Sequence, residues 1–124
     1  MLTPAGDVRI VATPGHTAGH VSVIVDDDAH SIFLAGDTSY SEANLVAGSV
    51  DSVASMGAGE DAAADTLRKI RSSAAARPTV YLPSHDPDSG RRLVERSTVD
   101  LPERPWWPPS GSSGGQFLRR SSFR

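Results

Sequence analysis

The stretch at residues 13–20, Thr-Pro-Gly-His-Thr-Ala-Gly-His, constrains the fold of this chain more than any other. It places two histidines, two glycines and a proline between two apolar runs, so the chain must turn here. Gly15 and Gly19 permit a tight turn, and Pro14 fixes its own φ angle. The backbone of such a loop sets the direction of a histidine side chain, which is what a metal ligand needs. We therefore expect His16 to belong to a metal site.

Short β-rich runs flank this loop and continue beyond it. Residues 7–12 are expected to form a strand that leads into the loop. Residues 20–25 are a second strand candidate with apolar side chains on both faces, which is typical of a covered strand rather than an edge strand. The polar residues 26–30 separate it from a third strand at 31–35. The second and third strands should therefore form an antiparallel hairpin.

Helices are expected in the second half of the chain. The clearest one covers residues 60–76, where alanine, leucine and isoleucine recur at helical spacing. Residues 41–59 are small, polar and weakly periodic, and they predict a long loop with one helical turn near 42–46. Residues 79–83 predict a fourth strand, and Asp88 is expected to cap a last short helix.

Length and composition limit the class of protein. A chain of 124 residues forms one domain at most, which we place at residues 1–101. From residue 102 the composition changes to proline, glycine, serine and arginine, and residues 102–124 predict a disordered tail. A formal net charge of −3 argues against nucleic acid or an anionic membrane as the main partner.

Two absences narrow the chemistry further. The chain has no cysteine, which excludes disulfides, thiolate chemistry and cysteine-ligated zinc. No apolar run approaches the roughly 18 residues that a membrane-spanning helix needs, and the start of the chain lacks a signal pattern. We therefore expect a cytoplasmic protein without a membrane partner.

Three polar side chains, those of His16, Asp37 and His85, each end or follow an apolar segment. If the strands are neighbours, their loops can converge on one rim of the sheet. Two imidazoles and a carboxylate are the ligand set expected for zinc or a similar divalent ion when no thiol is available. The alternatives are a solvated loop histidine for His16 and for His85, and a turn cap for Asp37. His20 is expected to be structural and to hydrogen-bond the loop.

Three segments together resemble the later motifs of the metallo-β-lactamase superfamily. They are Thr-Pro-Gly-His-Thr-x-Gly-His at 13–20, Gly-Asp-Thr-Ser-Tyr at 36–40 and Leu-Pro-Ser-His-Asp at 82–86. The spacing between the motifs also fits, and the resemblance covers roughly residues 7–88. Within the superfamily, an aspartate followed three residues later by a tyrosine most resembles the N-acyl homoserine lactonases, which open the lactone ring of quorum-sensing signals.

The resemblance implies a role for each matched residue. His16 would bind the first of two zinc ions, Asp37 would bridge both ions, and His85 would bind the second. Tyr40 would contact the carbonyl or ring oxygen of the substrate, so Asp37 and Tyr40 are the expected catalytic residues. His20 would be structural, with Gly15 and Gly19 shaping the loop. Paired cations would lower the pKa of a bridging water and stabilise the oxyanion.

The resemblance is confined to half of the family pattern. The principal family motif, His-x-His-x-Asp-His, supplies three metal ligands and normally lies N-terminal to these motifs, but this sequence does not contain it. The family fold is a four-layer αββα sandwich of two similar halves. We therefore expect the C-terminal half of such a sandwich, an α/β fold with a mixed, largely antiparallel sheet and one or two covering helices. The chain would be a truncated fragment, unable to assemble the two-metal centre alone, and its uncovered sheet face would favour self-association.

The leading interpretation is a lactonase-like, zinc-dependent hydrolase of a small-molecule lactone or ester. One alternative is a thioester hydrolase of the glyoxalase II type, which shares the three ligands and which Tyr40 disfavours. Another is a non-catalytic fragment or interaction module that retains remnant ligands.

Overall fold

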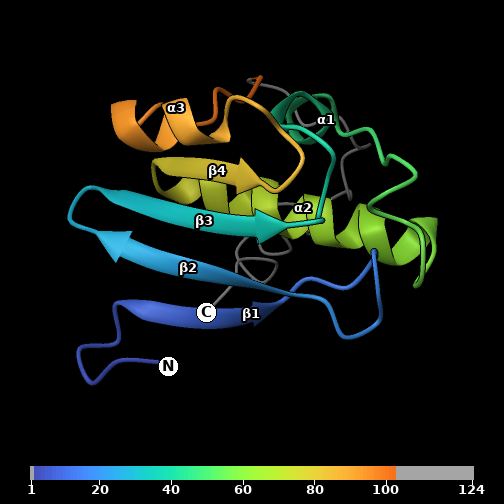
Figure 1. Cartoon of the computed structure of the whole chain (residues 1–124), viewed down its shortest axis with the longest axis horizontal. Coiled ribbons are helices and arrows are strands. Elements are labelled where there is room, and N and C mark those ends of the chain that lie inside the picture. Colours follow the sequence, from blue (N-terminus) through green and yellow to red (C-terminus); the bar gives the residue numbers. More distant parts are fainter. Residues whose placement is uncertain (1, 103–124) are drawn as a thin grey trace, which may run out of the picture.

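Four strands form one sheet in the order β1-β2-β3-β4 in this computed structural model, which describes residues 2–102 (Figure 1). The strands are β1 (Val8–Ala12), β2 (Val21–Asp27), β3 (His30–Gly36) and β4 (Thr79–Pro83). The pairings of β1 with β2 and of β2 with β3 are antiparallel, whereas β4 runs parallel to β3. Of the tail predicted at 102–124, the residues from 103 onward lie outside the described residues.

The hairpin predicted from the sequence is confirmed. Val23 of β2 lies opposite Leu34 of β3, and Val25 lies opposite Ile32. The parallel pairing of β3 with β4 requires a crossover connection, and two helices lie within it. The predicted fold class is also confirmed, because the chain forms an α/β structure with a mixed, largely antiparallel sheet, consistent with half of an αββα sandwich.

Three helices accompany the sheet: α1 (Glu42–Ala47), α2 (Glu60–Ala76) and α3 (Ser89–Glu95). The first two confirm the helical turn and the long helix predicted from the sequence. A last helix is also present and Asp88 is its N-cap residue, as predicted, but the Asp88 side chain makes no capping hydrogen bond. The amide of Asp88 instead donates to Asp86 Oδ1, and its carboxylate lies 3.8 Å from the guanidinium of Arg91. Among the described residues, no helix is long and apolar enough to cross a membrane.

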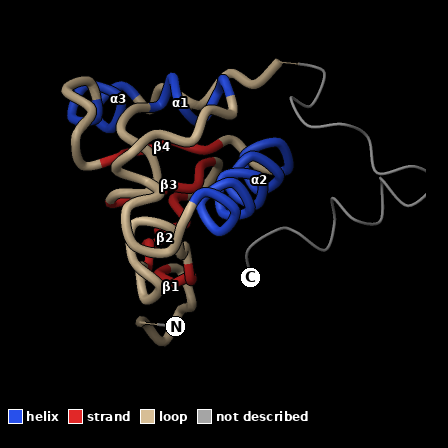
Figure 2. Tube along the Cα trace, turned by 90° about the vertical axis from the view of Figure 1, so that its right-hand side faces the viewer, coloured by secondary structure: helices blue, strands red, loops and turns tan. Residues whose placement is uncertain are grey.

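The main core lies between one face of the sheet and α2 (Figure 2). Ile24 of β2 and Phe33 of β3 point to this face because side chains alternate along a strand. Leu67 and Ile70, one helical turn apart, present the apolar side of α2 to them. The core cluster consists of Val11, Ile24, Phe33, Ala35, Leu45, Leu67, Ile70 and Tyr81. The alternation of side chains along the strands and the helical spacing in α2 thus place their apolar side chains in one layer between the sheet and the helix.

The opposite face of the sheet is only partly covered by the described elements. Near β4, a second cluster contains Ile32, Val80 and Leu82, with Val25 packed against it. Toward β1, Ile10, Val21 and Leu34 remain 50%, 50% and 43% exposed. The second strand is interior, as predicted, but the prediction that it is covered on both faces is wrong, because α2 packs on one side only. We call the exposed surface formed by Ile10, Val21 and Leu34 the open face.

Tyr81 is buried in the core, and its hydroxyl anchors the loop that follows β3. The hydroxyl oxygen lies 2.7 Å from Ser39 Oγ and also hydrogen-bonds Thr38 Oγ1. Burial raises the pKa of Tyr81 to about 12, although both hydrogen bonds act in the opposite direction. The fold therefore favours the neutral phenol.

This burial predicts a loss of stability at alkaline pH. The pKa of Tyr81 is raised from 10.0 to about 12, so its contribution to stability is complete below pH 10 and is lost as the pH rises toward 12. Urea unfolding of the wild type and of Tyr81→Phe across this range measures the effect, because other titrating groups are common to both proteins. The difference between their free energies of unfolding should shrink as the pH rises. If the free energies of unfolding of the two proteins change in parallel with pH, the raised pKa of Tyr81 is contradicted.

Candidate metal centre

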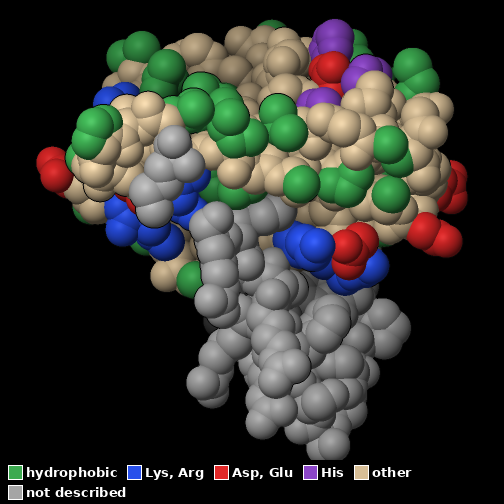
Figure 3. All heavy atoms as spheres, turned by 90° about the horizontal axis from the view of Figure 1, so that it is seen from below, with side chains coloured by type: hydrophobic (Ala, Val, Ile, Leu, Met, Phe, Trp, Pro, Cys, Tyr) green, Lys and Arg blue, Asp and Glu red, His purple; other side chains and the backbone are tan. Residues whose placement is uncertain are grey.

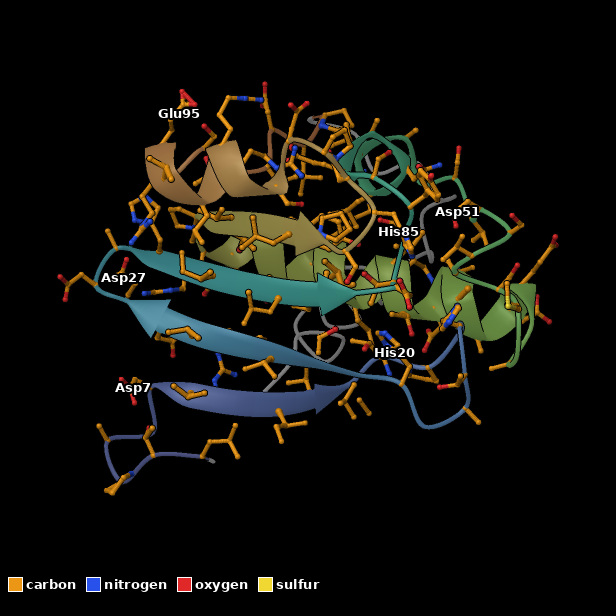
Figure 4. All side chains as sticks on the ribbon, viewed as in Figure 1. Asp7, His20, Asp27, Asp51, His85 and Glu95 are labelled. Atoms are coloured by element: carbon orange, nitrogen blue, oxygen red, sulfur yellow. The ribbon has the colours of Figure 1, made fainter. Side chains whose placement is uncertain are left out.

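The three predicted ligands lie on loops at one edge of the sheet. His16 follows β1, Asp37 follows β3 directly, and His85 follows β4. Because β1, β3 and β4 run in the same direction, their carboxyl ends share this edge. Figure 4 shows the labelled His20 and His85 at this end of β3, and Figure 3 shows histidine side chains gathered beside a carboxylate on the surface.

Asp37 lies between the two histidines. Its Oδ2 is 3.4 Å from Nε2 of His16, and its Oδ1 is 3.0 Å from Nε2 of His85. Each imidazole therefore faces a different oxygen of one carboxylate. The structure brings together the three residues that the sequence singled out, and their role as ligands stays a prediction.

A backbone contact orients the ring of His16. Its Nδ1 lies 2.6 Å from the carbonyl oxygen of Val53, which can only accept a hydrogen bond. Nδ1 therefore carries the proton, and in the neutral ring Nε2 presents a lone pair toward Asp37. Two acceptors then face each other at 3.4 Å, an arrangement that a proton or a cation between them would stabilise.

The loop at residues 13–20 is held against α2 and the segment that precedes it. Thr66 Oγ1 of α2 donates to the carbonyl of Pro14 at 2.6 Å. A Cβ atom on Gly15 would lie 2.6 Å from the carbonyl oxygen of Ala54, so only glycine fits this approach. A Cβ on Gly19 would meet nothing within 4 Å, so the structure shows no steric reason for glycine there.

His20 supports the backbone of Asp37 rather than its carboxylate. Its Nδ1 lies 3.0 Å from the carbonyl of Thr13 and therefore carries the proton. Its Nε2 accepts a hydrogen bond of 3.0 Å from the backbone amide of Asp37. The sequence predicted a structural histidine that bonds its own loop, and the structure adds this second contact with a residue 17 positions away.

Substitution of Gly36 should disturb this contact. Gly36 has a φ of +57°, and a Cβ there would lie 2.8 Å from Nε2 of His20. Gly36→Ala is expected to displace the ring, break its bond to the Asp37 amide and lower the free energy of unfolding by about 1–3 kcal/mol. Urea denaturation measures this change. Gly90→Ala is the matched control, since a Cβ on Gly90 meets nothing within 4 Å. Equal stability of the two variants would refute the proposed clash.

Tyr40 lies at the same rim and stacks on His85. The ring centroids are 5.4 Å apart and the ring planes differ by 13°. The Tyr40 side chain is half-exposed, and its backbone amide donates to Oδ2 of Asp51 at 2.7 Å. The structure thus places Tyr40 beside a predicted ligand, while its contact with substrate stays a prediction.

Sequence reasoning missed several residues that shape this site. The carbonyl of Val53 has no signal in the sequence, because every residue carries one. Asp51 anchors Tyr40, and Asp86 accepts a backbone hydrogen bond from the start of α1. The position of Asp86 directly after His85 in the motif was the available signal.

The candidate ligands form two pairs, each of one histidine nitrogen and one Asp37 oxygen, rather than one cluster around a common point. In the part of the chain that the structure describes, no three His, Asp or Glu side chains surround a common point that could hold an ion. However, Asp37 Oδ1 is buried without a hydrogen-bond partner, and the nearby His85 nitrogen does not have hydrogen-bond geometry toward it. The two nitrogen–oxygen distances resemble the separation of about 3.3 Å between neighbouring ligands on one tetrahedral zinc ion. Each pair would thus offer two ligands.

Comparison with known proteins identifies the family of the chain. The family model of the metallo-beta-lactamase superfamily matches residues 1–85, which is more than half of the chain. The matched region includes His16 and Asp37 and ends at His85. No curated protein matches the chain.

Proposed function

The chain belongs to the metallo-beta-lactamase superfamily, and we propose that it acts as a metal-dependent hydrolase of small lactones or esters through His16, Asp37 and His85. The observation that carries the proposal is the contact between His16 and Asp37. His16 Nδ1 donates to the Val53 carbonyl, so in the neutral ring the Nε2 lone pair faces a carboxylate oxygen at 3.4 Å. Such a pair of acceptors is suited to a shared cation.

The residues of this chain would orient the reacting groups. A bound divalent ion, which we take to be zinc, lowers the pKa of a water ligand and polarises a carbonyl oxygen. Asp37 would hold its two oxygens toward separate histidines, while the bond from its amide to His20 keeps its backbone in place. Tyr40 exposes its phenol at the same rim and can donate a hydrogen bond to a substrate oxygen.

Tyr40 supports the lactonase form of this proposal. A hydroxyl donor beside His85 suits the carbonyl or ring oxygen of a lactone. A thioester hydrolase that uses the same three ligands would not need this donor. Loss of lactone hydrolysis in Tyr40→Phe would therefore support the lactonase form, whereas thioester hydrolysis that Tyr40→Phe leaves unchanged, with no lactone hydrolysis by the wild type, would favour the alternative. A cytoplasmic location stays a prediction alongside the substrate class.

The isolated chain supplies few ligands. It has four histidines, and two of them face Asp37. Each ion would then have one imidazole and one carboxylate oxygen from this chain, whereas zinc in catalytic sites normally has three protein ligands. We therefore propose that the chain alone binds zinc weakly, and a non-catalytic role is the second candidate.

One experiment separates these functions. The chain is assayed against short-chain and long-chain N-acyl homoserine lactones, a simple ester and a thioester, with and without added zinc. Because the chain alone should bind zinc weakly, we expect lactone hydrolysis only with zinc in excess over the protein. His16→Ala should abolish this hydrolysis, and His30→Ala, at the far end of the hairpin, should leave it unchanged. Hydrolysis that is independent of zinc and of His16 would contradict the proposed function, and no hydrolysis of any probe would favour the non-catalytic role.

The open face is proposed to cause self-association with a second copy of the chain. Its three apolar side chains lie on adjacent strands, with Val23 between Ile10 and Leu34 in the strand register. Light scattering should show a mass that rises with concentration, and Leu34→Lys should reduce this rise. Val94→Lys, on the exposed side of α3, is the control. A monomer at all concentrations would contradict this proposal.

A further inference from the structure

A buried ionic cluster lies next to the candidate metal centre. Arg92 of α3 has only 8% of its side chain exposed, and its Nη2 lies 2.8 Å from Oδ2 of Asp86, which is 7% exposed. The Nε of Arg92 lies 2.7 Å from Oε2 of Glu42, at the start of α1. Burying charges is costly, so such a cluster is weak evidence for stability in itself. Its position suggests another role.

Asp86 connects two segments that are distant in the sequence. Its Oδ2 accepts a hydrogen bond of 2.9 Å from the backbone amide of Glu42, and its Oδ1 accepts another from the amide of Asp88. The first bond joins the loop after β4 to the first residue of α1, 44 positions earlier. Asp86 is therefore bound to both segments and to Arg92 at the same time.

The loops that carry Asp37 and His85 are consequently fastened at two points. Next to the sheet, the amide of Ser84 donates to the carbonyl of Gly36 at 2.8 Å. On the far side of His85, Asp86 is tied to the start of α1, which closes the loop that begins at Asp37. His85 lies between the two fastenings, and its half-exposed ring contacts Asp37 and Tyr40 from the other loop.

The two carboxylates of the cluster are not equivalent. Burial acts to raise the pKa of Asp86, but the amides of Glu42 and Asp88 and the guanidinium of Arg92 outweigh it, so the pKa is lowered. Burial raises the pKa of Glu42, and Arg92 only partly offsets this. Asp86 is thus the carboxylate that the surroundings stabilise in its charged form.

We propose that Asp86 and Arg92 are positioning residues of the candidate metal centre, which hold His85 against Asp37 by fastening the loop after β4 to the start of α1. The link to metal binding rests on the proposed function. The positioning itself is a property of the metal-free chain and can be measured without any ligand.

The stack of Tyr40 on His85 provides the readout. An aromatic ring stacked at 5.4 Å shifts the ring-proton resonances of its neighbour, and Tyr40→Leu identifies this contribution in the NMR spectrum of the metal-free protein. Asp86→Asn is expected to move the His85 ring resonances toward those of an unstacked histidine, while the core Phe33 resonances stay native. The matched control is Asp88→Asn, an exposed carboxylate two residues away, which should leave both unchanged.

Zinc binding gives the second readout. Asp86→Asn should weaken the binding of zinc alone by about 10–100-fold, as for other residues that orient a metal ligand, and Asp88→Asn should not. A folded Asp86→Asn protein with wild-type His85 resonances would overturn the proposal. If Asp86→Asn does not fold, Arg92→Lys takes its place, because lysine keeps the charge but lacks the forked guanidinium. A shift of the His85 resonances in Arg92→Lys would support the proposal, and wild-type His85 resonances would overturn it. If the His85 resonances move but the wild type binds no zinc, the positioning role stands and the proposed function fails.

Discussion

Replacement of Asp37 by asparagine is expected to weaken zinc binding by at least about 100-fold, more than the loss of a residue that only orients a ligand. The carboxylate faces both His16 and His85, so its loss affects both pairs of donors. An amide of the same shape offers one acceptor oxygen and places an NH₂ group where the other oxygen was. Titration of the chain with zinc in competition with a chelator measures the change, and Asp61→Asn, on the exposed side of α2, is the control.

The same substitution should not destabilise the metal-free fold. Asp37 Oδ1 is buried without a hydrogen-bond partner, and Oδ2 faces Nε2 of His16, which carries a lone pair in the neutral ring. Removing the negative charge therefore removes an unsatisfied acceptor rather than a stabilising contact. If Asp37 were only a turn cap, Asp37→Asn would leave zinc binding unchanged, because asparagine caps a turn as well as aspartate does, and Asp37→Ala would lower the free energy of unfolding. Urea denaturation in a chelating buffer distinguishes the two outcomes.

Replacement of Arg92 by methionine is expected to lower the free energy of unfolding by about 3–5 kcal/mol. Methionine keeps the aliphatic part of the side chain but has no charge, so the carboxylates of Asp86 and Glu42 would remain in their largely buried positions without their cation. Removal of one partner of a buried ion pair is far more costly than removal of a surface partner, because the remaining charge cannot be solvated. Urea denaturation at neutral pH measures the effect.

The neighbouring arginine provides the control for this measurement. Arg91 is exposed and pairs with Glu95 one helical turn away. Arg91→Met should change the free energy of unfolding by no more than about 0.5 kcal/mol, as is usual for an exposed ion pair. Similar losses in Arg91→Met and Arg92→Met would show that the Arg92 cluster has no special importance for the fold.

Much of the candidate site could be predicted from the sequence because its residues follow regular elements. Two strand candidates at 20–25 and 31–35, joined by five polar residues, predicted the hairpin, and helical spacing predicted the helix at 60–76. His16, Asp37 and His85 each come after a predicted strand, and the parallel strand ends then place them at one edge. The motif spacing, in turn, agreed with the family match.

The last helix shows where sequence reasoning fails. Its apolar residues Leu93 and Val94 would be assigned to a buried face, yet Val94 is 82% exposed and Arg92 is buried. In a helix of seven residues the apolar pattern is too short to define a face. The burial of Arg92 depends on Glu42, which is 50 positions earlier in the chain, and no local pattern reports such a partner.

The sequence by itself determined the order and type of the elements, the turn at residues 13–20 and the identity of the donor side chains, since these depend on neighbouring residues and on intrinsic backbone preferences. Only the tertiary structure decided that the Val53 carbonyl sets the tautomer of His16 and that His20 supports the Asp37 amide. It also decided that Asp86 fastens the His85 loop to α1. These contacts join residues 17 to 44 positions apart, so they exist only where the tertiary fold brings the loops together.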